Sequence, residues 1–198
     1  VISSNQDDSK LMLNSFQSIW QSTSDTAHNN ATLNIITLPD DITSMSSSLL
    51  ELKAQIASIN HDMVLLALPA DKAYLVRPHL DISTPAMAFS NVNVITDNAI
   101  PQLLNAVRLA DMPFLLMADQ EKFKDYSSAS ADLSTNELRR WFALGADSLQ
   151  LLIISQKPPD NEVAFNGLTG TLTVSRTGNL QRQLSLARFT YNGVIPEQ

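Results

Sequence analysis

Residues 63–68 (MVLLAL) are apolar at every position, and this run limits the possible folds more than any other feature of the sequence. A continuous apolar run of this length predicts a strand that is buried on both faces, as strands in parallel sheets are. Pro69 and Asp71 follow the run directly, and both residue types favour the first turn of a helix. The chain is therefore expected to contain a parallel sheet that is covered by helices.

The first hundred residues repeat this alternation of strand and helix. Short apolar or β-branched runs alternate with segments whose apolar residues recur every three or four positions. Strands are expected at residues 1–2, 33–38, 63–68 and 86–90, and helices at residues 7–22, 41–59 and 69–77. This order predicts a doubly wound α/β layer with a parallel sheet.

The second half of the sequence has a different pattern. Residues 105–112 are expected to be extended, residues 119–132 to form a loop with a helical turn, and residues 172–174 and 183–191 to form a β-hairpin. Ser134 and Glu137 form a capping box, which predicts the start of a long helix over residues 134–156. The buried face of that helix is expected to contain its large apolar residues: Leu138, Trp141, Phe142, Leu149, Leu152 and Ile153.

Composition and charge exclude several classes of function. The formal net charge of -7 and the pI of about 4.8 argue against nucleic acid or an anionic membrane surface as the main partner, because both attract clustered Lys and Arg. The chain has no cysteine, which excludes disulfides, thiolate catalysis and cysteine-based zinc sites. No run of about 18 apolar residues could span a bilayer. No signal peptide is visible, so an export signal would lie outside this sequence.

The sequence shows no set of residues that would carry catalysis. His28, His61 and His79 have no metal-ligand spacing and are interpreted as loop histidines in contact with solvent. The sequence contains neither a Gly-x-Ser-x-Gly elbow nor a phosphate loop nor a dinucleotide-binding glycine motif. We therefore expect a protein that is not an enzyme and that has no metal or cofactor.

A candidate cleft follows from the expected parallel sheet. In open α/β sheets, ligands bind outside the carboxyl ends of the strands. The residues that follow the predicted strands are small, polar or helix-opening: Ser4, Asn5, Pro69, Ala70, Asp71, Ser90 and Asn91. Asp71 has a second interpretation, because an acidic residue in the first turn also stabilises its own helix. Asp147, inside the long predicted helix, either bonds across a lobe interface or lies partly exposed.

Four stretches of the chain carry a resemblance to a known protein family. The first two are LALPADKAYLVRPHL (residues 66–80) and LNAVRLADMPFL (residues 104–115). The third is RRWFALGAD (residues 139–147). The fourth and most specific is GLTGTL (residues 167–172), followed by NLQRQL (residues 179–184) and GVIP (residues 193–196). In their order and spacing, these stretches resemble the LpoA family of penicillin-binding-protein activators over most of the chain.

The resemblance implies a fold of the type I periplasmic-binding-protein class. Residues 1–98 would form the main α/β lobe, and residues 99–162, with the helix 134–156, a partial second lobe. Residues 163–198 would be crossing strands and a hairpin that return to the main lobe. The opening strand–helix units of one lobe have no counterpart here, so the chain is either a fragment or a reduced relative. An incomplete lobe leaves strand edges unpaired, which can favour a homodimer.

The function that the resemblance implies is non-catalytic. Members of the family are lipid-anchored in the outer membrane, reach across the periplasm and stimulate a class A penicillin-binding protein. The lipidated cysteine and the N-terminal helical-repeat domain of the family would lie outside this sequence. The alternative function is a solute-binding module for a small polar ligand, which the same fold class supports.

Overall fold

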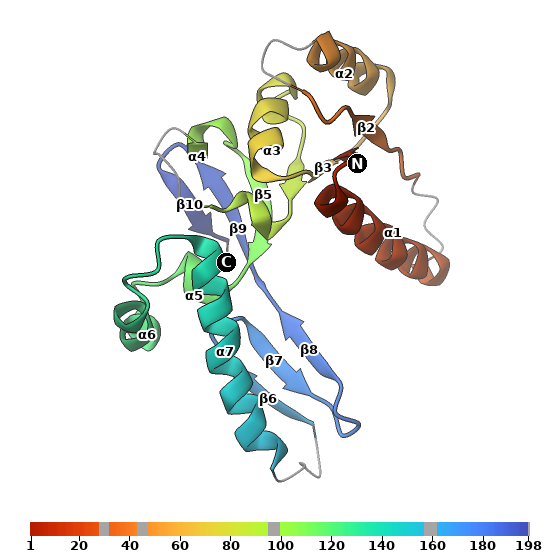
Figure 1. Ribbon diagram of the computed structural model, residues 1–198. Helices are drawn as coiled ribbons and strands as arrows, with labels where there is room; N and C mark the ends of the chain where they lie inside the picture. Colours follow the sequence, from red (N-terminus) through yellow and green to blue (C-terminus); the bar gives the residue numbers. More distant parts are fainter. Residues whose placement is uncertain (28–31, 43–46, 95–99, 157–161, 198) are drawn as a thin grey trace. The chain divides into compact units, whose positions relative to one another are not determined.

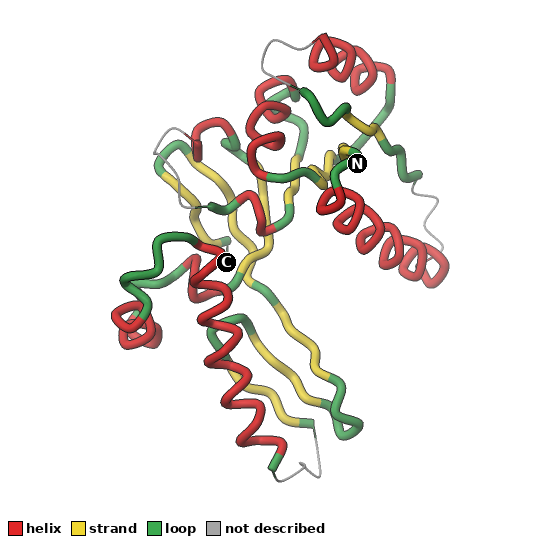
Figure 2. Tube along the Cα trace, in the orientation of Figure 1, coloured by secondary structure: helices red, strands yellow, loops and turns green. Residues whose placement is uncertain are grey.

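The computed structural model of the chain describes residues 1–27, 32–42, 47–94, 100–156 and 162–197 (Figures 1 and 2). The chain divides into two compact units. Unit 1 consists of Val1–Val92, Asn98–Leu109 and Phe189–Gly193, and unit 2 of Asn93–Asp97, Ala110–Arg188 and Val194–Gln198. Each unit is therefore built from segments that are distant in the sequence.

The larger sheet has seven strands in the order β10-β9-β5-β4-β3-β1-β2. Its parallel strands are β1 (Ile2–Ser4), β2 (Ile36–Leu38), β3 (Val64–Ala67), β4 (Ala86–Ala88) and β5 (Val107–Asp111). The remaining two are β9 (Ser185–Thr190) and β10 (Gly193–Pro196). The part β2-β1-β3-β4-β5 has the strand order of a doubly wound fold. The parallel sheet predicted from residues 63–68 is therefore present.

The helices of unit 1 connect these parallel strands. They are α1 (Asp7–Ala27), α2 (Ser47–Ser58), α3 (Ala70–Val76) and α4 (Ile100–Leu103), with the short 3₁₀ helices η1 (Arg77–His79) and η2 (Ser90–Val92). The chain moves outward from β1 to β2 and then returns past β1 to β3. Because parallel crossovers are right-handed, this reversal requires α1 on one face of the sheet and α2 and α3 on the other. Contacts of α2 with η1 and of α3 with α4 agree with this arrangement.

Strand β3 lies in the interior of unit 1. Its four residues are all buried, and Leu66 and Ala67 have no exposed surface. The apolar run that predicted this strand is slightly longer than the strand itself, which begins at Val64. Met63, just before it, is 44% exposed. Burial on both faces explains why β3 carries only aliphatic side chains.

Unit 2 combines a long helix with a small antiparallel sheet. The helices are α5 (Pro113–Leu116), α6 (Lys124–Ala129) and α7 (Asn136–Ser155), with the 3₁₀ helix η3 (Glu121–Phe123) before α6. The sheet has the order β6-β7-β8 and consists of β6 (Val163–Asn166), β7 (Thr171–Val174) and β8 (Leu180–Gln183). Figure 1 shows α7 lying along β6 and β7.

Aromatic side chains form the core of unit 2. The ring of Phe114, which is 1% exposed, lies 5.9 Å from the ring of Phe123 and 6.1 Å from that of Phe142. Met112, Ala143 and Leu168 complete the buried cluster. Such pairs of tilted and edge-to-face rings stabilise a core beyond the area that they bury. The cluster ties α5 and η3 to α7 and to the turn before β7.

Several expectations from the sequence are wrong in detail. The first helix does not end at Ser22 but continues to Ala27. Within it, the hydroxyl groups of Ser22 and Thr23 donate to the backbone carbonyl oxygen of Ile19. The expected strand at residues 33–38 is reduced to β2, and the long helix is capped by Thr135 rather than Ser134. Residues 119–132 contain η3 and α6. The antiparallel partners of β7 are β6 and β8, whereas most of the segment 183–191 forms β9 in the larger sheet.

The expected buried face of the long helix is also wrong. Only Phe142 packs against the core, while the rest of the expected face is 46–64% exposed: Leu138, Trp141, Leu149, Leu152 and Ile153. We call these five residues the apolar face of α7. The helix instead buries Ala143 and Asp147, because α5 and the turn before β7 lie against that side. A periodic pattern identifies an apolar stripe, but burial requires a surface that covers it.

The apolar face of α7 should add little to the stability of this chain. Changing Leu149 and Leu152 together to glutamine is expected to alter the free energy of unfolding by less than about 1 kcal/mol, since surface substitutions have small effects. The matched variant Leu172→Ala removes a side chain with no exposed surface from the same unit. This variant should lower the free energy of unfolding by about 2–5 kcal/mol. Chemical unfolding of both variants checks this, and a large loss in the double variant would contradict the observed exposure.

Candidate functional site

The residues of the candidate cleft follow β1, β3 and β4. These strands are adjacent and parallel, so their carboxyl ends lie at one edge of the sheet. The order of the strands reverses between β1 and β3, and this is the kind of position at which ligands bind in open α/β sheets. The candidate cleft of seven residues remains a prediction, but the geometry that it requires is present.

The residues after β1 are a buried serine and an exposed asparagine. Ser4 is 2% exposed, and its hydroxyl donates to the hydroxyl of Ser9 on α1 over 2.9 Å. The side chain of Asn5 is exposed. Ser4 is thus engaged in joining strand to helix, and Asn5 is the residue at this position that a ligand could reach.

The residues after β3 open α3. Pro69 is the N-cap residue and gives no side-chain cap, and Asp71 lies exposed in the first turn. Sequence reasoning missed the next residue, Lys72, which is 3% exposed. Its ammonium group donates to the carbonyl oxygens of Pro39 and Asp40, just after β2. Lys72 therefore holds the loop after β2 against α3. The sequence around a single lysine in a helix gives no sign that its side chain will be buried.

The residues after β4 lie in η2. The amide nitrogen of Asn91 donates to the carbonyl oxygen of Leu68 over 2.9 Å, which ties the ends of β3 and β4 together. Its amide oxygen Oδ1 is buried and has no hydrogen-bond partner among the residues that the structure describes. Ser90, which precedes Asn91 in η2, is half-buried, and so is Ala70 at the start of α3. An unpaired buried acceptor at a strand end is a feature that a hydrogen-bond donor of a ligand would satisfy.

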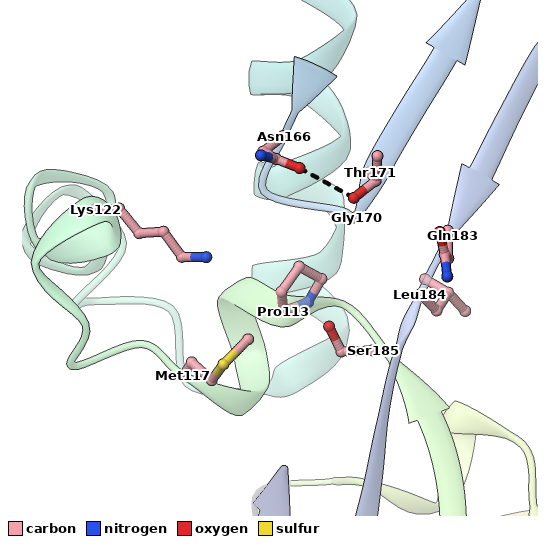
Figure 3. Close-up of a pocket in the computed structure, with 10 residues that line it drawn as sticks. Pro113, Met117, Lys122, Asn166, Gly170, Thr171, Gln183, Leu184 and Ser185 are labelled. Atoms are coloured by element: carbon pink, nitrogen blue, oxygen red, sulfur yellow. Dashed lines mark hydrogen bonds between the residues drawn. The ribbon is translucent and has the colours of Figure 1, made fainter. Parts of the chain in front are cut away.

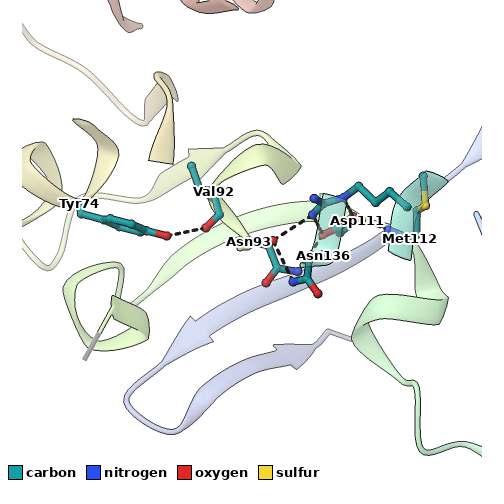
Figure 4. A network of polar contacts seen from close by, with 7 residues as sticks. Tyr74, Val92, Asn93, Asp111, Met112 and Asn136 are labelled. Atoms are coloured by element: carbon teal, nitrogen blue, oxygen red, sulfur yellow. Dashed lines mark hydrogen bonds and ion pairs between the residues drawn. The ribbon is translucent and has the colours of Figure 1, made fainter. Parts of the chain in front are cut away.

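A buried ion pair organises unit 2 around the end of β5 (Figure 4). Asp111 is 1% exposed, and its carboxylate accepts from the guanidinium of Arg140 over 2.6 Å and 3.2 Å. Asn93 and the backbone N–H of Met112 each donate to the same carboxylate over 2.8 Å. Asn136 in turn donates to the backbone oxygen of Asn93 over 2.9 Å. The network connects β5, α7 and the segment after η2, and the sequence alone did not identify Arg140 as part of a buried ion pair.

A second carboxylate holds the turn between β6 and β7. Asp147 is 3% exposed and accepts hydrogen bonds from the backbone N–H groups of Leu168 and Thr169, each over 2.8 Å, and from the Thr169 hydroxyl over 2.6 Å. A Cβ atom at Gly167 would collide with this carboxylate, so only glycine fits. Of the two interpretations of Asp147, the structure places it in contact with the turn rather than exposed on the helix.

The same turn forms one wall of a hollow of about 240 Å³ in unit 2 (Figure 3). Lys122 extends into it from η3, and Asn166, Thr171 and Gln183 contribute polar groups from the three strands of the small sheet. Thr171 donates to the side-chain oxygen of Asn166 over 3.0 Å. Its other wall includes Pro113 and Met117. A hollow with one cation and several amide and hydroxyl groups suits a polar segment of a partner better than an apolar ligand.

The described residues show no grouping of three or more His, Asp or Glu side chains that could hold a metal ion. His61 bonds to the carbonyl oxygen of Ile59 over 2.8 Å, and His79 is half-buried in η1. His28 lies outside the described residues. Among the described residues, no helix is both long and apolar enough to span a bilayer.

Comparisons with solved structures identify the fold. The chain is similar to the C-domain of LpoA (YraM) from Haemophilus influenzae, a regulator of PBP1A, with a TM-score of 0.71 and 16% identity over 100% of this chain and 60% of that one. It is also similar to a putative branched-chain amino acid ABC transporter protein from Chromobacterium violaceum, with a TM-score of 0.74 and 22% identity over 94% of this chain and 57% of that one.

A third similar structure is a solute-binding protein of an ABC transporter from R. palustris in complex with benzoate. Its TM-score is 0.59 and its identity 14%, over 98% of this chain and 56% of that one. This chain thus spans only about 60% of the LpoA C-domain and 35% of full-length LpoA from H. influenzae. These likenesses confirm the predicted periplasmic-binding-protein-like α/β fold. A comparison with curated proteins gives no match.

The family comparison covers almost the whole chain. Residues 5–192 match the model of the family described as "LppC putative lipoprotein". The match includes the ends of β3 and β4 and both buried carboxylates of unit 2, Asp111 and Asp147. It agrees with the likeness to LpoA that the sequence motifs indicated. The chain belongs to the LppC lipoprotein family.

Proposed function

We propose that the chain is part of a non-catalytic periplasmic regulator that binds and stimulates a class A penicillin-binding protein during peptidoglycan synthesis. The observation that carries this proposal is the agreement of two comparisons, the LppC family match over residues 5–192 and the fold of the LpoA C-domain, itself a regulator of PBP1A. The acidic net charge of -7 also suits a protein partner better than nucleic acid. Attachment to the outer membrane would come from a lipid on a part of the protein outside this chain.

The test uses the class A penicillin-binding protein of the same organism. The folded 198-residue chain and the longest natural protein that contains it are each immobilised, and retention of the synthase is measured. Peptide cross-linking by the synthase is then followed with each protein added in solution. We expect retention and faster cross-linking, because a regulator must bind the synthase in order to change its rate.

An acidic solute-binding protein of the same fold class serves as the control, and it should neither retain nor stimulate the synthase. If the chain fails while the longer protein succeeds, the proposal stands for the protein but not for these residues alone. If both fail although their circular dichroism shows that they are folded, the proposal is wrong.

The second candidate function is a solute-binding module for a small polar ligand. The observation in its favour is the unpaired buried oxygen of Asn91 beside the strand ends. A thermal shift screen with amino acids, nucleosides and muropeptides separates the two functions. A shift of several degrees with one class, lost in Asn91→Ala, would favour solute binding, since a ligand stabilises the folded state that it binds.

A further inference from the structure

Arg77 is a buried cation in unit 1 that has no carboxylate partner among the described residues. It is 3% exposed, and among the described residues its guanidinium donates only to backbone carbonyl oxygens. Nε bonds to Asn105 over 3.3 Å, and Nη1 bonds to Leu80 over 3.4 Å and to Asp81 over 3.3 Å. The carboxylate of Asp81 is engaged elsewhere, because it accepts from the backbone N–H and the hydroxyl of Ser83, each over 2.8 Å.

The remaining nitrogen of this guanidinium is not satisfied. Nη2 of Arg77 is buried and has no hydrogen-bond partner in the part of the chain that the structure describes. Burial lowers the pKa of Arg77, and the nearby charge of Asp81 opposes this only in part. A buried charge without a counter-ion is costly, and buried charges in proteins are normally paired. Asp81 therefore compensates the charge of Arg77 only in part, and Nη2 has no acceptor within the described residues.

A hollow of about 260 Å³ lies against Arg77. It is formed by η1, α4 and the turn between β9 and β10. Three large side chains on its rim are strongly exposed: Ile82 at 63%, Leu103 at 43% and Tyr191 at 66%. An apolar rim around a buried arginine combines the two features that ligand pockets use, apolar contact area and a few polar groups that fix orientation.

We propose that this hollow binds a small organic carboxylate with an apolar body. The carboxylate bonds to Nη2 of Arg77, and the apolar body packs on Ile82 and Tyr191. Because Nη2 is covered in the present structure, a rim side chain has to move aside when the ligand enters, and exposed side chains of this kind change rotamer readily. The site is separate from the strand ends of the candidate cleft, and the proposal does not depend on the proposed function.

The test compares two probes that differ only in charge, 3-phenylpropionate and 3-phenylpropanamide. Binding is measured by titration of the isotope-labelled 198-residue chain and observation of its backbone amide signals. We expect the acid to bind at least about ten-fold more tightly than the amide, the difference that about 1.4 kcal/mol produces. The signals that move should belong to Arg77, Leu80, Asn105 and Tyr191, not to Asn5 and Asn91 at the strand ends.

Two variants and a peptide complete the test. Tyr191→Ser removes an exposed rim side chain and should weaken binding of the acid several-fold without unfolding the chain. Leu50, on α2, is about as exposed as Tyr191, so Leu50→Ser should leave binding of the acid unchanged. A short peptide that ends in a phenylalanine carboxylate, compared with its C-terminal amide, shows whether the acid comes from a chain end or only from a free small molecule. Equal binding of acid and amide, or shifts confined to the strand ends, would overturn the proposal.

Discussion

Replacing Asp147 with alanine is expected to lower the free energy of unfolding of unit 2 by about 3–5 kcal/mol. The carboxylate accepts three hydrogen bonds from the turn before β7, and two of the donors are backbone N–H groups, those of Leu168 and Thr169. Alanine would leave both groups buried without an acceptor, at about 1–3 kcal/mol each. Chemical denaturation followed by circular dichroism measures the loss, and hydrogen exchange of the two amides shows where it arises.

Gln150→Ala is the matched control, since Gln150 lies exposed one turn further along the same helix. It should change stability by less than about 0.5 kcal/mol. Asp147→Asn should be intermediate, because an amide keeps one acceptor oxygen but turns an NH₂ group toward a donor. If Asp147→Ala were as stable as Gln150→Ala, the carboxylate could not be what holds the turn.

The second large effect is expected at Arg140. Changing it to methionine keeps most of the side-chain volume but leaves the carboxylate of Asp111, which is 1% exposed, without its cation. Removing one member of a buried pair costs about 3–5 kcal/mol, because the other charge stays in the interior unpaired. Asn93 and the N–H of Met112 still donate to Asp111, so the loss should fall at the lower end of this range.

Arg139→Met is the control for this prediction. Arg139 is the adjacent arginine of α7, and it donates to the backbone oxygen of Leu133. Its substitution should cost about 1 kcal/mol, the value of a typical hydrogen bond. The double variant Arg140→Met with Asp111→Asn should recover part of the stability, since the amide carries no charge but keeps an acceptor oxygen for the N–H of Met112. Equal losses in Arg139→Met and Arg140→Met would argue against the special role of the Asp111 pair.

The parts of the fold that were predictable from the sequence are those that depend on short-range patterns. Residues 63–68 specify β3 by themselves, because only a strand buried on both faces favours so long an aliphatic run. Pro69 and Asp71 mark the start of α3 for equally local reasons. The alternation of such signals was enough to predict a doubly wound α/β layer with a parallel sheet, while the order of its strands came from the structure.

The parts that could not be predicted depend on contacts between distant residues. Lys72 and Arg140 are ordinary helical residues in the sequence, and only their positions against the loop after β2 and against Asp111 make them buried. The same reason explains the error on α7. The spacing of Leu138, Trp141 and Leu149 defines an apolar stripe correctly, but which side of a helix is covered depends on what else the chain places there.

The interleaved make-up of the two units has a consequence for how the protein is made. Strand β9, which lies next to β5 in the larger sheet, is synthesised only after residues 112–184. Until it emerges, β5 presents an unpaired edge, and an edge of this kind can pair with other chains. The growing chain can form β1 to β5 early, but neither unit has all its strands until β9 and β10 have emerged. The interval between the synthesis of β5 and that of β9 is therefore when the open edge of β5 is most exposed to misassembly.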